Sequence, residues 1–360
     1  MMRILIATDA WHPQVNGVVR SLQQTADHAT AQGAEIAFLS PADFRTVPMP
    51  TYPEIRLALT TGRAVTRRIR DIAPDYVHIA TEGPVGLLTR NVCLARGQVF
   101  TTSYHTKFPE YLAARAPVPQ RLSYAWLRRF HNAGAGIMVS TGTLEAELTQ
   151  RGFRNIMRWS RGVDSELFRP RTMAEIDDAQ LTALPRPLFL YVGRVAVEKN
   201  IEAFLRLDLP GSKVVVGDGP ARADLQARYP SAHFLGKQEG ERLARTYASA
   251  DVFVFPSLTD TFGIVLLEAL ASGLPVAAFP VTGPLDVIGG TLAGPEPVGA
   301  LDTDLRQAAL KALHLDRGAA RHFALGYSWE ACTRDFLANI ERAQGKARRP
   351  FARPPLAHAS

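Results

Sequence analysis

Short apolar runs alternate with amphipathic stretches along the chain, a pattern that predicts parallel sheets covered by helices. In the first half, the strands expected from this pattern are Arg3–Thr8, Glu35–Leu39, Tyr76–Ile79, Val99–Thr102 and Gly136–Val139. The helices expected between and after them are Val18–Gln32, Thr61–Ile72, Gly83–Arg96, Gln120–Asn132 and Thr143–Arg151.

The second half repeats the alternation. Its expected strands are Leu188–Val192, Lys213–Val216, His233–Leu235, Val252–Phe255 and Val276–Phe279, and its expected helices are Ile201–Leu207, Ala221–Tyr229, Glu239–Ala250 and Gly263–Ser272. This sheet is expected to end near Ile288, before a loose Gly/Pro stretch, Gly289–Gly299. The pattern therefore predicts an α/β protein with two Rossmann-like domains that face a central cleft, where ligands bind beyond the carboxyl ends of the strands.

The length of 360 residues also favours two domains over one. We expect an N-terminal domain over residues 1–170, a linker over 171–187 and a C-terminal domain over 188–326. A helix over 327–343 is expected to follow, and the Pro- and Arg-rich tail 344–360 is expected to be disordered.

Composition limits the class of protein. No apolar run approaches the roughly 18 residues that a spanning helix needs. Cys93 and Cys332, the only two cysteines, are far apart, so we expect no disulfide framework and a cytoplasmic setting. Residues 1–170 carry a net charge of +7, from 20 Lys and Arg against 13 Asp and Glu. This half and the tail 341–360, which has a net charge of +4, are therefore the surfaces expected to meet an anionic partner, and no motif points to nucleic acid.

The segment Ser257–Gly273 carries the strongest chemical signal, because it places Asp260 and Glu268 eight positions apart. It predicts a turn after the strand Val252–Phe255 and a helix from about Gly263. Free amides at the start of that helix would attract a diphosphate, and the two carboxylates could bind sugar hydroxyls. A capped helix with surface acids is the simpler alternative.

Two cations follow the strand Leu188–Val192. Arg194 and Lys199 lie five positions apart in the loop at its end. Such a pair can neutralise a diphosphate and stabilise it as a leaving group. The alternative is a solvated loop pair.

Two loops of the first half add candidates. Gly17, in DAWHPQVNGVV, allows close approach of a ligand to the backbone, and the loop lacks the GxGxxG of an NAD site. His105, in TSYHTKFPEY, follows the fourth strand and could reach a sugar hydroxyl or a leaving oxygen. His78 and His131 lack such a context, and a structural role is expected for them.

A metal site is not expected. Asp302 and Asp304 form a DxD pair, but they precede a helix, where Asp is expected as an N-cap. The glycines Gly217 and Gly236 end two strands of the second half in tight turns.

Taken together, these segments resemble retaining glycosyltransferases of the GT-B fold, of the large group-1/family-4 type. SYHTKFPEY and TDTFG especially resemble lipid α-mannosyltransferases and sulfoquinovosyl-diacylglycerol synthase-like enzymes. Many members have Glu where this chain has Asp260, which shortens the reach by one methylene. The resemblance also implies that a last helix, from about Tyr327, crosses back to the N-terminal domain.

The resemblance implies a role for each matching residue. Catalytic roles fall to His105, Asp260, Arg194 and Lys199, with Asp260 on the hexose. Glu268 would hold the ribose, and Arg161 could line the cleft. Contacts to the nucleotide sugar are implied for Gly17, Arg194, Lys199, Gly217, Gly236, Lys237, Phe262, Gly263, Ile264 and Glu268, with no metal and no cofactor.

The implied reaction moves a hexose from a nucleotide diphosphate sugar to a lipid or glycan hydroxyl and keeps the α configuration. GDP-mannose is the first donor expected, ahead of UDP-linked glucose, glucuronate or sulfoquinovose. A UDP-sugar epimerase and a non-catalytic sugar-nucleotide-binding protein remain alternatives. Basic and aromatic residues interleave in Thr61–Arg70 and Pro119–Asn132. They suggest peripheral contact with the inner face of a membrane, or else a core-packed helix with a solvated basic face.

Overall fold

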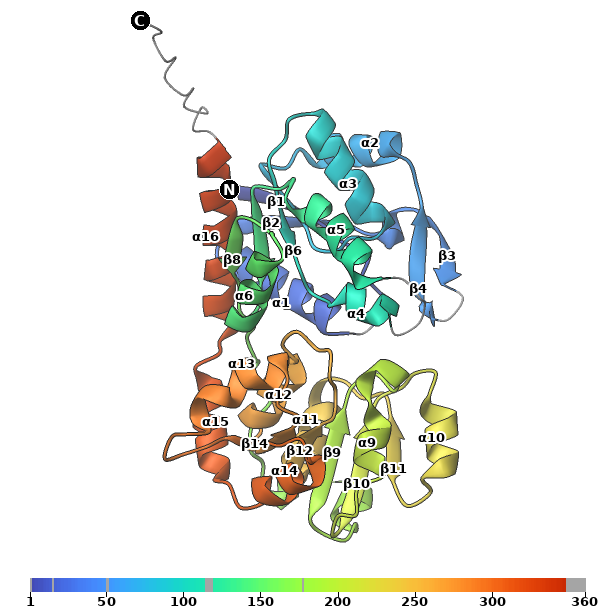
Figure 1. Ribbon diagram of the computed structural model, residues 1–360, viewed down its shortest axis with the longest axis vertical. Helices are drawn as coiled ribbons and strands as arrows, with labels where there is room; N and C mark the ends of the chain where they lie inside the picture. Colours follow the sequence, from blue (N-terminus) through green and yellow to red (C-terminus); the bar gives the residue numbers. More distant parts are fainter. Residues whose placement is uncertain (1, 15, 50–51, 114–118, 177, 348–360) are drawn as a thin grey trace, which may run out of the picture.

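Two six-stranded parallel sheets form the framework of the protein. A computed structural model describes residues 2–14, 16–49, 52–113, 119–176 and 178–347. Figure 1 shows the two sheets with their helices as two lobes, one above the other. The predicted α/β class with two parallel-sheet domains is therefore confirmed.

The first sheet has the strand order β2-β1-β5-β6-β7-β8. Its strands are β1 (Met2–Ala7), β2 (Ala34–Leu39), β5 (Tyr76–Ile79), β6 (Phe100–Ser103), β7 (Gly136–Val139) and β8 (Ile156–Arg158). Its helices are α1 (Gly17–Ala31), α2 (Gly62–Ile72), α3 (Pro84–Ala95), α4 (Phe108–Ala113), α5 (Gln120–His131) and α6 (Gly142–Gln150). A 3₁₀ turn, η1 (Pro41–Asp43), precedes an antiparallel hairpin of β3 (Arg45–Met49) and β4 (Tyr52–Leu59).

Apart from Arg3, strand β1 is apolar, as expected where helices cover both faces of a sheet. Leu5 packs on one face with Val65 and other residues of α2. Ile4 and Ile6 pack on the opposite face with Leu22 of α1. All three β1 residues are fully buried. The alternation along one strand therefore fixes which helices lie on which face.

The second sheet has the equivalent order β11-β10-β9-β12-β13-β14. Its strands are β9 (Leu188–Val192), β10 (Ser212–Val216), β11 (His233–Gly236), β12 (Val252–Phe255), β13 (Val276–Ala278) and β14 (Gly299–Leu301). Its helices are α9 (Ile201–Leu205), α10 (Arg222–Arg228), α11 (Gly240–Ser249), α12 (Ile264–Ala271), α13 (Thr282–Ile288), α14 (Leu305–Ala312) and α15 (Arg317–Leu325). Two 3₁₀ turns, η2 (Val197–Lys199) and η3 (Gly289–Thr291), complete this half.

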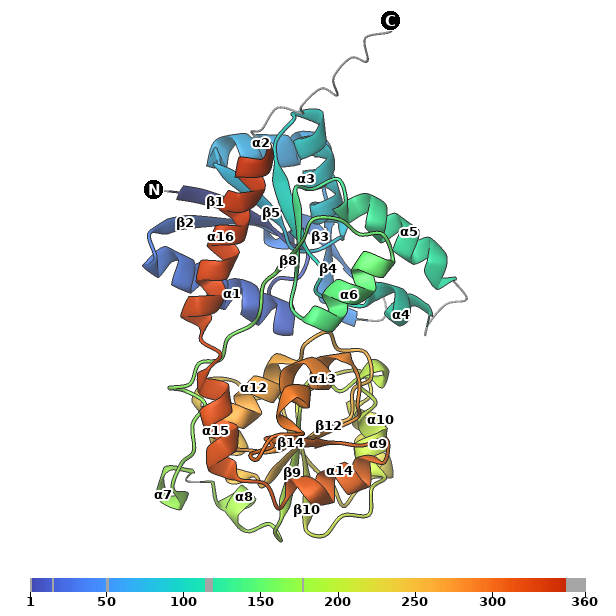
Figure 2. The same cartoon turned by 60° about the vertical axis from the view of Figure 1, so that its left-hand side comes forward.

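The last helix, α16 (Trp329–Ala347), crosses back to the N-terminal lobe, as predicted (Figure 2). Trp329 and Phe336 are buried there with Ile4 and Ile6 of β1. The helix also corrects the predicted tail, because residues 344–347 continue it. Residues 348–360 lie outside the described part of the chain.

One further expectation was wrong. The second sheet does not end near Ile288, because β14 follows the Gly/Pro stretch and pairs with β13. The segment 171–187, predicted as a linker, contains two short helices, α7 (Met173–Ile176) and α8 (Ala179–Thr182). Ile176 and Leu181 are buried, and Leu181 belongs to the C-terminal core. No helix in the described ranges is long and apolar enough to cross a membrane.

Candidate functional site

The loops that follow the strands of the two sheets meet at the junction between the lobes. A side chain at Gly17, the first residue of α1, would lie 4.0 Å from the Cδ1 of Ile264, the first residue of α12. Thr261 donates its hydroxyl to the backbone oxygen of His105, at 2.7 Å. Lys107 reaches the Thr282 hydroxyl of α13, at 3.2 Å. The junction therefore brings together the loops in which the sequence placed its candidates.

Asp260 and Lys199 form one ion pair of this junction. The Lys199 Nζ lies 2.5 Å from the Asp260 Oδ1, and both side chains are largely buried. Asn200 supports the pair by donating its amide to the Pro256 oxygen, at 3.1 Å. The cation expected at a diphosphate and the carboxylate expected at a hexose thus lie side by side.

Glu268 is held from both lobes. Its Oε1 accepts a hydrogen bond from the Arg20 Nη1 of α1, at 2.7 Å, and its Oε2 accepts one from the Tyr247 hydroxyl of α11, at 2.9 Å. Glu268 is 4% exposed, so this is a partly buried, charge-assisted arrangement. Burial and the neighbouring Glu268 raise the pKa of Tyr247 well above its usual range. The tyrosine therefore stays a hydrogen-bond donor.

Helix α12 begins with an uncapped turn. Gly263 has φ of +82°, a left-handed conformation that favours glycine, and no side chain caps the helix there. A Cβ on Gly263 would come within 3.1 Å of the Phe255 Cζ. Because α12 carries no acid in its first turn, its amino end keeps its positive partial charge.

His105 lies at the end of β6 and contacts a buried arginine. Its Nδ1 lies 3.0 Å from the Arg161 Nη2, whereas its buried Nε2 has no hydrogen-bond partner among the described residues. Burial, and then the charge of Arg161, hold the pKa of His105 well below its usual range. The imidazole is therefore neutral at neutral pH.

The remaining predicted residues are two glycines, whose backbone conformation and packing matter, and Lys237 and Phe262, whose side chains have partners of their own. A Cβ on Gly217 would lie 1.8 Å from the Gly193 oxygen, so close backbone packing already requires glycine there. Gly236 has φ of +74° and accepts from the Gly217 amide, at 2.8 Å. Lys237 is exposed and pairs with Glu239, at 3.2 Å. Phe262 belongs to the C-terminal core, which leaves its backbone for any ligand contact.

Several contacts of this junction were not expected from the sequence. Arg20 and Tyr247 were missed as partners of Glu268 because they lie 248 and 21 positions away from it. Arg161 was expected only to line the cleft, and its contact with His105 joins segments 56 positions apart. No local spacing signals such pairs.

The described residues contain no group of three His, Cys, Asp or Glu side chains that could hold a metal. Asp304 instead caps α14 through a 2.9 Å bond from the Arg306 amide, as predicted.

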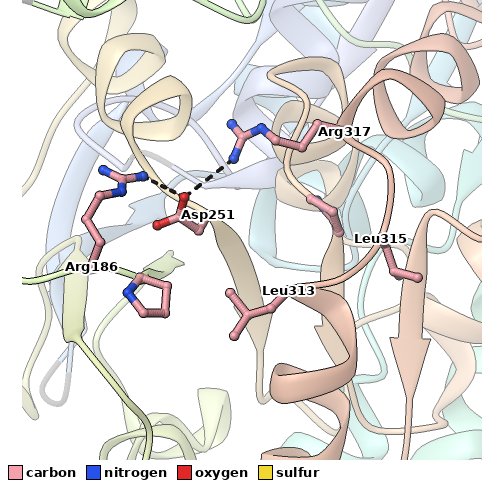
Figure 3. A pocket seen from close by; sticks show the side chains of 7 residues that line it. Arg186, Asp251, Leu313, Leu315 and Arg317 are labelled. Atoms are coloured by element: carbon pink, nitrogen blue, oxygen red, sulfur yellow. Dashed lines mark hydrogen bonds and ion pairs between the residues drawn. The ribbon is translucent and has the colours of Figure 1, made fainter.

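A cavity of about 370 Å³ lies elsewhere, beside the amino ends of β9 and β12. Figure 3 shows Arg186 and Arg317 on either side of Asp251, which they contact at 2.6 and 3.8 Å. Asp251 also accepts the Leu188 amide, at 2.7 Å. These charges hold β9, β12 and α15 together, and they lie at the opposite end of the sheet from the candidate residues.

Solved structures place this architecture among the GT-B glycosyltransferases. Sucrose-phosphate synthase from Thermosynechococcus elongatus matches with a TM-score of 0.75 and 19% identity, over 96% of this chain and 100% of that one. Anabaena HepE, solved with UDP and glucose, matches with a TM-score of 0.73 and 13% identity, over 95% and 100%. At these identities the matches establish the fold alone.

Sequence comparisons establish the family. The group-1 glycosyl transferase model matches residues 186–313, and the family-4 glycosyltransferase model matches residues 15–167. A GDP-mannose-dependent alpha-mannosyltransferase of Mycobacterium tuberculosis is 32% identical over 96% of this chain and 98% of its own length. Sulfoquinovosyl transferase SQD2 of Arabidopsis thaliana is 30% identical over 80% of this chain and 61% of its own. The chain belongs to the group-1/family-4 glycosyltransferases, and it is a transferase enzyme.

Proposed function

We propose that the protein transfers mannose from GDP-mannose to a hydroxyl of a lipid or glycan, with retention of the α configuration. The observation that carries this proposal is the meeting of Asp260–Lys199, Glu268 and His105 at the junction of the two lobes. GDP-mannose is the donor named for the Mycobacterium tuberculosis relative and for a second one, from Mycolicibacterium smegmatis, at 32% identity.

The diphosphate would lie among Arg194, Lys199 and the amino end of α12. Two cations and free amides are what a doubly charged leaving group requires. Lys199 already lies at the junction in an ion pair with Asp260. When the diphosphate arrives, the same ammonium can contact both the phosphate and Asp260 through different protons.

The sugar and the ribose would bind to the carboxylates. Each carboxylate oxygen of Glu268 has one further lone pair available after its bond from Arg20 or Tyr247, so a ribose hydroxyl can still donate to it. Asp260 would accept from hexose hydroxyls, and His105 would contact the hexose near the anomeric carbon. Gly17, Gly217, Gly236, Lys237 and the backbone of Phe262–Ile264 are the remaining proposed donor contacts.

The reaction would follow a front-face course. The bond between the anomeric carbon and the diphosphate oxygen breaks as the acceptor oxygen bonds to the same face of that carbon. The acceptor proton goes to the departing phosphate oxygen, so no separate protein base is required. Arg194 and Lys199 stabilise the negative charge that develops on the phosphate.

A panel of radiolabelled nucleotide sugars, incubated with the purified protein and native membrane lipids, tests this proposal. Labelled mannose in the lipid fraction is the expected result. Transfer of label only from a UDP-sugar would show that this sugar, and not GDP-mannose, is the donor. Interconversion of a UDP-sugar without transfer would point to an epimerase. Binding without turnover of any donor would point to a non-catalytic protein.

A UDP-sugar donor is the second candidate, because the Arabidopsis relative is named a sulfoquinovosyl transferase. The glycines Gly217 and Gly236 do not distinguish guanine from uracil, since backbone packing already accounts for them. The donor panel therefore includes UDP-glucose, UDP-glucuronate and UDP-sulfoquinovose.

We also propose that the N-terminal lobe contacts anionic lipids, in a cytoplasmic setting on the inner face of the membrane. A groove of about 930 Å³ lies between α2 and α3. Arg63, Arg70 and Arg96 line it beside the apolar Leu88 and Val92. Basic groups around an apolar floor suit a phospholipid headgroup and its first methylenes. On α5, Leu122 and Trp126 are exposed as well, and exposed apolar side chains of this kind suit a membrane interface.

A further inference from the structure

Arg161 is a buried arginine whose contacts contain no carboxylate among the described residues. It is 5% exposed. Its Nη1 donates to the backbone oxygens of Trp159 and Ser160, at 2.8 and 2.7 Å, and its guanidinium lies over the Trp159 ring, at 4.3 Å from the centroid. Burial lowers the pKa of Arg161 to about 10, so the group stays charged at neutral pH. Burying a charge without a carboxylate partner is costly, so we expect this arginine to have a specific role.

Within the described part of the chain, Arg161 makes one hydrogen bond to another side chain, that of His105. An arginine nitrogen can only donate, so the His105 Nδ1, at 3.0 Å from the Arg161 Nη2, must be the acceptor. A neutral imidazole whose Nδ1 accepts carries its proton on Nε2. The contact therefore selects one tautomer of His105.

The Nε2 of His105 is buried and has no hydrogen-bond partner among the described residues. A buried N–H without an acceptor is destabilising, and such a group in a native protein is explained by a partner that completes it, such as a bound ligand or water. The backbone of the same residue is tied to the Asp260 loop by Thr261, at 2.7 Å. The unpaired N–H therefore lies on one of the two joined loops, those of His105 and Asp260, at which the sugar is proposed to bind.

We propose that Arg161 is a positioning residue, which holds His105 neutral and in the Nε2–H tautomer so that it donates a hydrogen bond to the donor sugar. This inference rests on the proposed function for the identity of the acceptor atom, a sugar oxygen. The assignment of the His105 tautomer does not depend on the proposed function.

The groups that surround His105 favour this protonation state. Arg161 follows β8, His78 lies on β5 and His131 ends α5, and each opposes a positive charge on His105. The thiol of Cys332, on α16, lies beside the arginine and donates to the Ser160 oxygen, at 3.2 Å. Within the described ranges, no carboxylate contacts the imidazole to favour its charged form.

Selective ¹⁵N-histidine labelling tests the tautomer in the free protein, with the His105 signals assigned from their loss in His105→Gln. The wild type is expected to show a protonated Nε2 and an unprotonated Nδ1. In Arg161→Met, the tautomers are expected to mix and the His105 pKa to rise, whereas Arg161→Lys should keep part of the preference. A protonated Nδ1 in the wild type would overturn the proposal, and this measurement needs no variant of Arg161 to fold.

Donor hydrolysis with GDP-mannose gives the functional readout. In Arg161→Met, kcat/KM is expected to fall by about 10- to 100-fold at pH 7, the loss typical of one misplaced hydrogen bond. The acidic limb of its pH profile should move upward. Arg321→Met is the matched control, because Arg321, like Arg161, donates to backbone oxygens, here those of Phe168, Ala271 and Ser165. An unchanged acidic limb in Arg161→Met, or the same shift in the control, would overturn the proposal.

The two measurements separate the failure of this inference from that of the proposed function. If His105 has the expected tautomer but no nucleotide sugar is turned over, the proposed function fails and the positioning role stands. If GDP-mannose is turned over and the tautomer in the wild type is the opposite one, only the positioning role fails.

Discussion

Arg20 and Glu268 are 248 positions apart in the chain, yet their side chains meet at 2.7 Å across the junction of the two lobes. The charge of Glu268 is the main cause of the raised pKa of Arg20. Because Tyr247 holds the second carboxylate oxygen, Glu268 has one fixed orientation. The proposed ribose-binding group is thus built by both lobes.

Removing the arginine should therefore weaken donor binding. In Arg20→Met, the carboxylate keeps only its bond from Tyr247, and we expect KM for the donor to rise by about 10-fold or more, with a smaller change in kcat. Arg206→Met, which breaks an exposed ion pair with Glu202, is the control and should leave KM unchanged.

The double variant Arg20→Met/Glu268→Gln refines this test. Since the two residues are in contact, the KM effects of the single changes should not add. Strict additivity would show that Arg20 acts on the donor independently of Glu268.

Lys199 should matter most to the chemical step. In Lys199→Met the leaving diphosphate loses a cation, and we expect kcat to fall by about 100- to 1,000-fold, as when one charge-stabilising donor is removed. Lys199→Arg should recover part of the rate. Steady-state kinetics of donor hydrolysis measures both. Lys213→Met serves as the control, because Lys213 donates to the Leu205 oxygen away from the junction. Equal losses in the two methionine variants would argue for a general effect on stability.

His78 makes the stability of the protein depend on pH. Its ring is fully buried between the hydroxyls of Thr101 and Ser103, at 2.9 and 2.8 Å. Burial lowers the pKa of His78 to about 3. The unfolded chain binds the proton first, near its ordinary pKa of about 6.5. The stabilisation is therefore complete above about pH 6.5 and is lost as the pH falls from there toward 3.

Urea denaturation at pH 7 and pH 5 measures this linkage. From His78 alone we expect the free energy of unfolding to fall by about 2 kcal/mol between the two values. In His78→Gln, the total decrease in the free energy of unfolding between pH 7 and pH 5 should be smaller than in the wild type by this amount. The other titrating groups still contribute in both proteins. Identical pH dependence in the two proteins would rule out a neutral buried His78.

The groove between α2 and α3 should bind anionic membranes. Each basic side chain near such a surface contributes about 1 kcal/mol, so Arg63→Gln/Arg70→Gln should lower partitioning by about 30-fold. Sedimentation with phosphatidylglycerol vesicles at low salt measures this. Arg206→Gln, in the other lobe, is the matched control. Failure of the wild-type protein to sediment with these vesicles would contradict the membrane proposal.

The central strands were predictable because burial on both faces makes them largely apolar, with His78 of β5 as an exception. Tyr76–Ile79, Gly136–Val139, Leu188–Val192 and Val252–Phe255 were predicted with the bounds that the structure has. The edge strands β8 and β14 were missed, since each is three residues long and too short for a pattern. The hairpin of β3 and β4 was missed as well, and Pro48 within it obscures the strand signal.

The candidate residues were predictable one by one, but their pairing was not. Asp260 and Lys199 each stood out in a loop after a strand, and nothing in their spacing of 61 positions joins them. The order of the strands in the sheet places these loops side by side, and the contacts between their long side chains depend on that placement. The domain boundaries and the roles of the site residues stay predictions.

The most direct test of the account is the anomeric configuration of the product formed from GDP-mannose and native membrane lipids. Wild-type protein is expected to yield an α-mannoside by NMR, and Glu268→Ala to yield little or none. A β-mannoside, no mannosylated lipid, or undiminished product from Glu268→Ala would contradict the account.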